Sequence, residues 1–143
     1  VRRRRQRQMC IRDQALPALE KALGIDPRPA LARTAALLQA DLDALDTVAA
    51  NWFTQTHRKE GKAVTLETKA LLAQPTAIRK RVWRMAALAA GARASDLRKV
   101  QLDAVDFLAT HRRGTGPIQL PGKVNCTRLA GTYELIFRAQ SKG

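Results

Sequence analysis

The stretch that decides the fold reads PALARTAALLQADLDALDTVAANWFTQT at residues 29–56. Its apolar side chains recur at steps of four and three residues, at Leu31, Ala35, Leu38, Leu42, Leu45, Ala49 and Trp52. This spacing places them along one side of an α-helix and is typical of a helix that packs along its whole length. At about 1.5 Å per residue, such a helix spans roughly 40 Å. We expect it to be the central element of the fold.

The spacing of apolar residues predicts three shorter helices, at residues 15–23, 75–90 and about 95–111. The first two have a proline in or beside their first turn and are each followed by a glycine, which are common start and stop signals of helices. In the last helix, the side chains that we expect to face the core are Leu97, Val100, Ala104, Phe107 and Leu108.

Short extended segments are expected mainly near the C-terminus. Glycine and proline residues separate three segments rich in Ile, Val, Thr and aromatic residues, at 117–120, 123–129 and 133–138. Upstream, we expect HRKEG at 57–61 to end the long helix, followed by a brief extended piece at 63–66 and a short helix at 67–73. The expected fold class is therefore mainly α, a helical bundle built on one long helix with a small C-terminal β-sheet or hairpin.

The charge of the chain predicts a polyanionic partner. Its 143 residues include 26 Lys and Arg but 12 Asp and Glu, which gives a net charge of +14. Six arginines lie in the first twelve residues, and the remaining +8 is still strongly basic. Two cysteines without zinc-site spacing favour a reducing cytoplasm, and no apolar run approaches the ~20 residues of a membrane span. Aromatic residues, at 4%, are too few for a base-stacking platform.

The opening VRRRRQRQMCIR has neither a helical apolar face nor strand alternation. A block of like charges normally stays solvated. Three interpretations remain open: a solvated or non-native leader, an RNA-binding arm, and a targeting peptide. We assign no site residue to 1–8.

Signals for catalysis are absent from the sequence. It has no Gly-rich phosphate loop and no G-x-S-x-G motif. The carboxylate clusters are Asp41, Asp43 and Asp46, and separately Asp103 and Asp106. A solvated helix face explains them better than a metal site does. His57 and His111 each follow a predicted helix, where an imidazole complements the helix dipole, and this role is favoured over acid–base catalysis.

The strongest binding candidate is the run RKRVWR at 79–84. Its four cations lie within one and a half helical turns and could contact successive phosphates. We expect that few acids nearby neutralise it, and Arg112 and Arg113 add a second cluster at the corner between helix and sheet. The alternative is an ordinary solvated helix face. Trp83 is expected to be a half-buried core residue rather than a stacking partner of a guanidinium.

Several segments of this sequence resemble those of a known protein family and occur in the same order. They are Arg12 with Leu16–Glu20, Ala30–Leu38 with Asp41 and Leu45–Asp46, Pro75–Val82, Ala90–Ala92, Asp103–Asp106, and Gly114-x-Gly116-Pro117-x-x-Leu120-Pro121-Gly122 with Arg128 and Gly131. The chain thus resembles, over about residues 12–138, the carboxy-terminal half of tRNA(Ile)-lysidine synthetase, in its actinobacterial form.

The resemblance implies an RNA-binding rather than a catalytic role for this chain. The family uses ATP to adenylate the wobble cytidine of the isoleucine tRNA with a CAU anticodon, and then attaches lysine there. An amino-terminal domain with a Ser-Gly-Gly-x-Asp-Ser loop holds ATP, and that motif does not occur in this sequence. The implied partners are tRNA and the amino-terminal ATP-binding domain of the same enzyme, without a membrane. No cofactor is implied here; ATP and lysine, with Mg, belong to the parent enzyme in the cytoplasm.

With this resemblance, the expected organisation is a leader at 1–11 that is disordered or not native, a helical tRNA-binding domain at 12–113, and a small β-rich segment at 114–143 packed on it. The cations expected to hold the tRNA backbone are Arg33, Arg79, Lys80, Arg81, Arg84, Arg112 and Arg113. Arg33 could instead serve packing or an ion pair. Two other functions fit the charge, a free-standing basic helical module that binds DNA or ribosomes, and a helix that binds acidic membranes.

Overall fold

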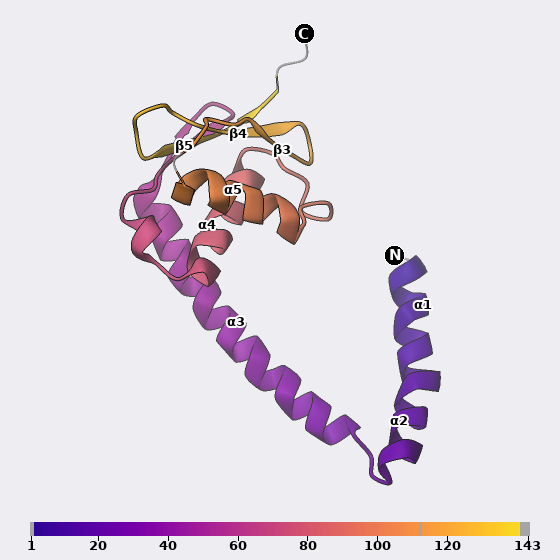
Figure 1. The fold of residues 1–143 in the computed structure, drawn as a ribbon. Coiled ribbons are helices and arrows are strands. Elements are labelled where there is room, and N and C mark those ends of the chain that lie inside the picture. Colours follow the sequence, from indigo (N-terminus) through magenta and orange to yellow (C-terminus); the bar gives the residue numbers. More distant parts are fainter. Residues whose placement is uncertain (1, 112, 141–143) are drawn as a thin grey trace. The chain divides into compact units, whose positions relative to one another are not determined.

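The computed structural model describes residues 2–111 and 113–140. The chain forms two compact units, residues 1–43 and 44–143, and we describe each by itself. The boundary falls within the long helix α3, Arg28–Thr56, which confirms the helix predicted at 29–56 (Figure 1). Among the described residues, no helix is both long and apolar enough to cross a membrane.

The first unit is helical and has little buried surface. It contains α1 (Arg2–Cys10), the π-helical turn η1 (Ile11–Ala15), α2 (Leu16–Leu23) and the first half of α3. Residues 2–10 of the segment expected to be a solvated leader form α1, and all of them are exposed. Helix α2 has Pro17 in its first turn and ends at Gly24, as the sequence predicted. The φ of Gly24 is 72°, a left-handed conformation that glycine adopts without strain.

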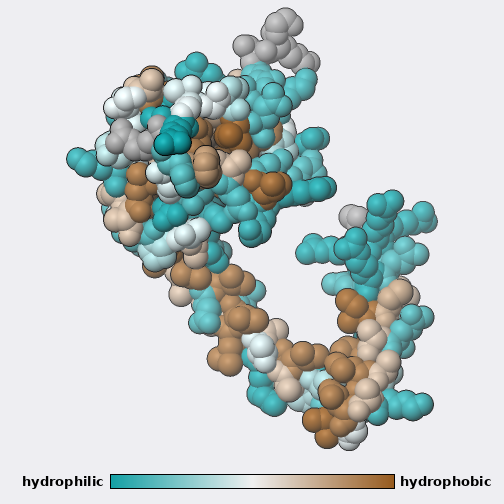
Figure 2. Space-filling model, in the orientation of Figure 1, coloured by the Kyte–Doolittle hydropathy of each residue, from teal (hydrophilic) through white to brown (hydrophobic). Residues whose placement is uncertain are grey.

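The first half of α3 does not pack as predicted. Leu31, Leu38 and Leu42 are 49%, 57% and 44% exposed, whereas Ala49, farther along the same helix, is fully buried. Figure 2 shows apolar surface along this part of α3. The expectation that the helix packs along its whole length is therefore wrong, because the regular spacing indicates an apolar side but not whether another element of the chain covers it.

The second unit is built on a five-stranded antiparallel sheet. Its strands are β1 (His57–Glu60), β2 (Ala63–Glu67), β3 (Ile118–Leu120), β4 (Val124–Arg128) and β5 (Glu134–Ala139). Their order is β1-β2-β5-β4-β3. Its helices are the second half of α3, η2 (Leu71–Ala73), α4 (Thr76–Ala89) and α5 (Lys99–His111), and α4 and α5 lie on one side of the sheet (Figure 1).

The fold class expected from the sequence is wrong, because the second unit is an α+β structure with a substantial sheet. The three C-terminal strands were predicted, but β5 pairs with β2, so they join β1 and β2 in one sheet rather than forming a small appendage. Strand β1 has the sequence HRKE, which carries no apolar alternation and suggested the end of a helix. Strand β2 is only five residues long and pairs with β5, from which about seventy residues separate it. Local patterns do not reveal such a distant partner.

The core lies between the inner face of the sheet and the two helices. From α4, the buried residues are Ile78, Val82, Trp83, Ala86 and Ala87. From the sheet, they include Val64, Leu66, Val124, Cys126, Leu135 and Phe137, which alternate with half-buried or exposed positions along their strands. Trp83 lies in the core, as predicted, but it is fully buried rather than half-buried.

Helix α5 differs in phase from the prediction. It begins at Lys99 instead of near Ser95, and it buries Val105, Leu108 and Ala109. Val100 and Phe107, which were expected to face inward, are 69% and 56% exposed. Because each residue turns an α-helix by about 100°, a shift of one position in the assigned face is enough to turn such side chains outward.

Candidate nucleic-acid interface

Arg79, the first cation of the predicted site, is part of a buried clamp between α4 and α5. Its Nε and Nη2 atoms donate to the two carboxylate oxygens of Asp106 at 2.8 and 2.9 Å. Its Nη1 atom donates to the carbonyl oxygen of Gln74, and the indole nitrogen of Trp83 also donates to Asp106, at 2.9 Å. The side chains of Arg79 and Asp106 are each 13% exposed. Arg79 is therefore occupied in holding the two helices together.

The environment of this clamp favours the charged forms of both partners. Burial alone would raise the pKa of Asp106, but hydrogen bonds from Arg79 and Trp83 outweigh it, and the pKa lies below its ordinary value. The hydrogen bond to Asp106 raises the pKa of Arg79. The clamp thus remains an ion pair near neutral pH.

Two more cations of the run have acidic partners. Lys80 and Lys99 both contact Asp103, and their hydrogen bonds lower the pKa of this carboxyl. Arg81 donates from Nε to Asp46 at 2.7 Å. The expectation that few acids neutralise the run is therefore wrong for three of its four cations. The acids lie on α3 and α5, and the fold brings them to α4.

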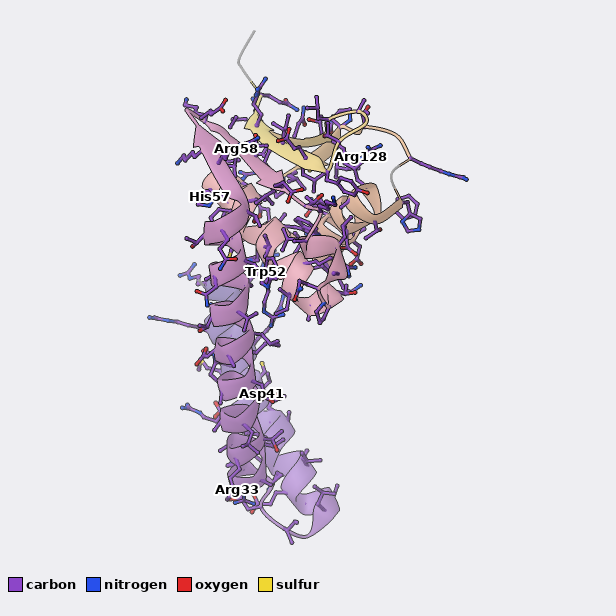
Figure 3. The ribbon with its side chains drawn as sticks, turned by 90° about the vertical axis from the view of Figure 1, so that its left-hand side faces the viewer. Arg33, Asp41, Trp52, His57, Arg58 and Arg128 are labelled. Atoms are coloured by element: carbon purple, nitrogen blue, oxygen red, sulfur yellow. The ribbon has the colours of Figure 1, made fainter. Side chains whose placement is uncertain are left out.

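The other predicted site residues are distributed over both units. Arg84 is half-buried, and Arg33 and Arg113 are exposed. None of these three side chains forms a hydrogen bond or an ion pair with another described residue. Arg33 lies on the part of α3 that belongs to the first unit (Figure 3). Arg112 lies outside the described residues. The second unit therefore contains Arg79, Lys80, Arg81, Arg84 and Arg113, but not Arg33.

The two histidines are found at helix ends, as predicted. His111 is the last residue of α5, and its ring stacks on Phe107 with centroids 3.8 Å apart. His57 directly follows α3, stacks on Phe53, and has its Nδ1 atom 2.7 Å from the carbonyl oxygen of Phe53. These local contacts explain both side chains without a catalytic role.

Arg128 has a structural role that the sequence did not reveal. It lies at the end of β4 and is 8% exposed. Its Nη2 atom donates to the carbonyl oxygen of Gly114 at 2.6 Å, and its backbone N–H donates to Thr115 (Figure 3). Arg128 therefore holds the segment that connects α5 to β3 and is not free to bind a phosphate.

One end of the sheet gathers cations that the sequence analysis missed. Ala63 pairs with Arg138 and Val124 pairs with Ala139, so the β1–β2 turn, the β3–β4 turn and the end of β5 lie at the same end of the sheet. We call this the basic end; its exposed cations are Lys62, Lys123 and Arg138. None of their side chains makes a bond or ion pair with another described residue.

Arg93 is held beside the basic end by close backbone packing. Its backbone N–H donates to the carbonyl oxygen of Pro121 at 3.3 Å. Next to it, Gly122 has a φ of +84°, and a Cβ atom there would lie 2.7 Å from the carbonyl oxygen of Gly91. The turn after α4 and the β3–β4 turn therefore touch, and this contact requires glycine at 122.

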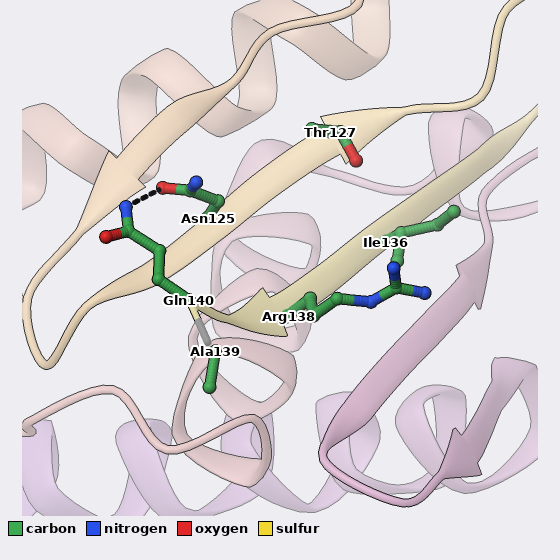
Figure 4. A pocket seen from close by; sticks show the side chains of 6 residues that line it. All are labelled: Asn125, Thr127, Ile136, Arg138, Ala139 and Gln140. Atoms are coloured by element: carbon green, nitrogen blue, oxygen red, sulfur yellow. Dashed lines mark hydrogen bonds between the residues drawn. The ribbon is translucent and has the colours of Figure 1, made fainter. Parts of the chain in front are cut away.

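The outer face of the sheet carries a shallow depression of about 270 Å³ at this end. It is lined by Asn125, Thr127, Ile136, Arg138, Ala139 and Gln140 (Figure 4). A second depression, of about 540 Å³, shares Gln140 with it and is lined also by Arg93, Gln119, Leu120, Pro121, Gly122 and Lys123. Neither lining contains a carboxylate. In the first, the Nε2 atom of Gln140 donates to Oδ1 of Asn125 at 2.9 Å.

The described residues include no cluster of metal ligands. No group of three His, Cys, Asp or Glu residues among them could hold a metal ion. Asp103 and Asp106 are engaged with Lys80, Lys99 and Arg79. The arrangement of cations and carboxamides is suited to binding phosphates and polar edges, and we derive no catalytic step from it.

Comparisons with known proteins find one matching family model and several similar curated proteins. A family model described as the TilS substrate binding domain matches residues 66–133, from within β2 to the residue before β5. Three similar curated proteins are each named tRNA(Ile)-lysidine synthase. That of Streptomyces coelicolor is 47% identical over 129 residues, 90% of this chain and 35% of that protein.

The protein of Thermobifida fusca is 43% identical over 113 residues, 78% of this chain and 34% of that protein. The protein of Mycobacterium bovis is 39% identical over 119 residues, 83% of this chain and 36% of that protein. The chain thus spans about a third of the length of the curated relatives that it matches.

Proposed function

Through its TilS substrate binding domain this chain belongs to the tRNA(Ile)-lysidine synthase family, and from this premise we propose that it is the tRNA-binding portion of such an enzyme. The observation that carries the proposal is the excess of cations in the second unit. Residues 44–143 include 17 Lys and Arg but seven Asp and Glu. Several of these cations have no acidic partner among the described residues after the ion pairs of α4 are counted. A surface of this kind attracts a polyphosphate.

Recognition would depend mainly on the phosphate backbone. Arg84 and Arg113 in the second unit and Arg33 in the first offer guanidinium groups that can each make two hydrogen bonds to a phosphate. Lys80 and Arg81 contribute to the local potential, although each has an acidic partner. Arg79 supports the interface by fixing α4 against α5.

In the parent enzyme, this chain would work together with the amino-terminal ATP-binding domain. That domain would use ATP, lysine and Mg for the chemistry at the wobble cytidine of the CAU-anticodon isoleucine tRNA. This chain would hold the tRNA so that the anticodon loop reaches the ATP site, and the process would take place in the cytoplasm. Its own residues would bind and orient the tRNA rather than transfer a group.

Binding of an isoleucine tRNA transcript by the 143-residue chain tests the proposal. Fluorescence anisotropy would compare this tRNA with a DNA duplex of similar length over a series of salt concentrations. We expect the chain to bind tRNA at least about tenfold more tightly than DNA, with an affinity that falls steeply as salt rises. Equal affinity for the two would contradict the proposal and favour a general basic module that binds nucleic acids.

A further inference from the structure

We propose that the open face of the sheet at its basic end is a second RNA contact, which binds a ribose–phosphate segment. Arg138 and Lys123 would contact phosphate oxygens, and the carboxamides of Asn125 and Gln140 would contact ribose hydroxyl groups or base edges. This inference rests on the proposed function, because it assumes that the chain binds tRNA. It adds a site on β3–β5 that lies apart from the α4 cations.

The two faces of the sheet differ in what covers them. The inner face packs on the helices and is buried at Val124, Cys126 and Phe137. The outer positions of the same strands, among them Asn125 and Ile136, remain half-buried, and α4 and α5 lie on the other side of the sheet (Figure 1). This face is polar and partly accessible, which suits a hydrated partner better than an apolar one.

Charge separates the two ends of this face. Glu134 and Glu67 pair across β5 and β2 at one end, where Arg58 contacts Glu134. At the other end, Arg138 has no acidic partner among the described residues. Glu60 lies two strands from it in the same row, roughly 10 Å away at the usual strand spacing. The electrostatic potential of this face therefore favours binding of anionic groups at the basic end.

The polar groups of the depression match the chemistry of a ribonucleotide. A guanidinium forms two parallel hydrogen bonds to a phosphate, and a carboxamide can donate and accept at a hydroxyl or a base edge. Asn125 and Gln140 already orient each other through their hydrogen bond, so little side-chain freedom remains to be lost on binding. The half-buried Ile136 provides an apolar floor for a sugar or base. RNA, rather than an acidic peptide, uses all of these groups.

The test compares two double variants of the full chain with equal changes in charge. Arg138→Gln with Lys123→Gln removes two cations of the basic end. Lys69→Gln with Arg98→Gln removes two exposed cations elsewhere in the second unit. We expect the first pair to lower affinity for the isoleucine tRNA transcript about tenfold and to reduce the salt slope by about two, as two lost phosphate contacts require. We expect the second pair to change affinity less than about threefold.

A variant that leaves the net charge unchanged separates specific hydrogen bonds from the general electrostatic attraction. Asn125→Ala should lower tRNA affinity about fivefold with an unchanged salt slope, since a lost hydrogen bond contributes about 1 kcal/mol. In the unmodified chain, the side-chain amide NMR signals of Asn125 and Gln140 should shift on addition of the transcript. The NMR measurement needs no variant and is unaffected by any loss of folding.

Two outcomes distinguish this inference from the proposed function. If the unmodified chain does not bind tRNA, the proposed function and this inference both fail. If it binds tRNA but the basic-end pair behaves like the matched pair and the amide signals do not shift, the inference alone is overturned. An equal loss of affinity for a DNA duplex in Asn125→Ala would overturn the contact to ribose hydroxyl groups.

Discussion

Helix α4 and the basic end of the sheet show two ways in which cations are distributed in this molecule. In α4, four cations lie within six residues of the sequence, yet three of them contact acids from α3 and α5. At the basic end, Lys62, Lys123 and Arg138 are far apart in the sequence, yet the strand pairing brings them to one end of the sheet, where none has an acidic partner in the described part of the chain. A dense run of charge in a sequence therefore does not by itself identify a free cationic surface.

The strongest way to test this comparison is to remove the acid that holds Arg79. Asp106→Ala leaves a mostly buried guanidinium without its partner and the indole of Trp83 without its acceptor. We expect the free energy of unfolding to fall by about 3 kcal/mol. Urea unfolding measures this loss. As the matched control, Asp103→Ala removes a more exposed partner and should cost clearly less stability; equal losses would contradict the structural role of the clamp.

The next largest effect should come from the contact beside the basic end. Gly122→Ala places a Cβ atom 2.7 Å from the backbone oxygen of Gly91 at a residue whose φ is +84°. We expect a loss of about 2 kcal/mol in thermal or urea unfolding, from the left-handed conformation and the close contact together. Gly131→Ala has a similar φ of +74° but nothing within 4 Å of the added atom, so it isolates the conformational cost of about 1 kcal/mol.

Acid should weaken the clamp at α4 by a smaller amount. The pKa of Asp106 is lower in the folded chain than its ordinary value, so this group contributes stability above the ordinary carboxyl pKa of about 4 and loses it as the pH falls through the folded value. The free energy of unfolding should therefore decrease below about pH 4. Asp106→Asn should show a shallower decrease when unfolding is measured from pH 6 to pH 2. Parallel curves for the two proteins would contradict this assignment.

We expect the smallest of these effects, a change in tRNA binding, when a cation with an acidic partner and one without are removed in turn from the same helix. Arg84→Gln removes a guanidinium without a partner in the described part of the chain, whereas Arg81→Gln removes one that contacts Asp46. We expect Arg84→Gln to lower tRNA affinity about fivefold and the salt slope by about one, and Arg81→Gln to have a weaker effect. Anisotropy titrations measure both. A larger effect of Arg81→Gln would mean that its ion pair opens on binding.

The sequence predicted the elements that local signals define. Strands β3, β4 and β5 lie close to the predicted segments, because glycine and proline mark their ends and alternation marks their faces. Helix α4 also agrees with its prediction, since Pro75 and Gly91 bound it. The extended piece predicted at 63–66 corresponds to β2, but its pairing with β5, a partner distant in sequence, could not be recognised, and β1 was not predicted.

The candidate site was harder to predict for the same reason. The partner of Arg79 is Asp106, 27 residues later on another helix, and no local pattern joins the two. One signal was available: Asp103 and Asp106 lie three residues apart on a predicted helix, which puts them on neighbouring positions of one face. Arg138 could have been noticed from the alternation of β5, which turns it to the face opposite Phe137.

The shared carboxylate of Asp106 has a practical consequence. Trp83 is one of two tryptophans in the chain, and its indole nitrogen is bonded to the same oxygen that receives the Nε hydrogen of Arg79. The intrinsic emission of the indole therefore senses whether the two helices remain joined. Spectroscopy without any attached label can follow the integrity of this junction during titration with a ligand.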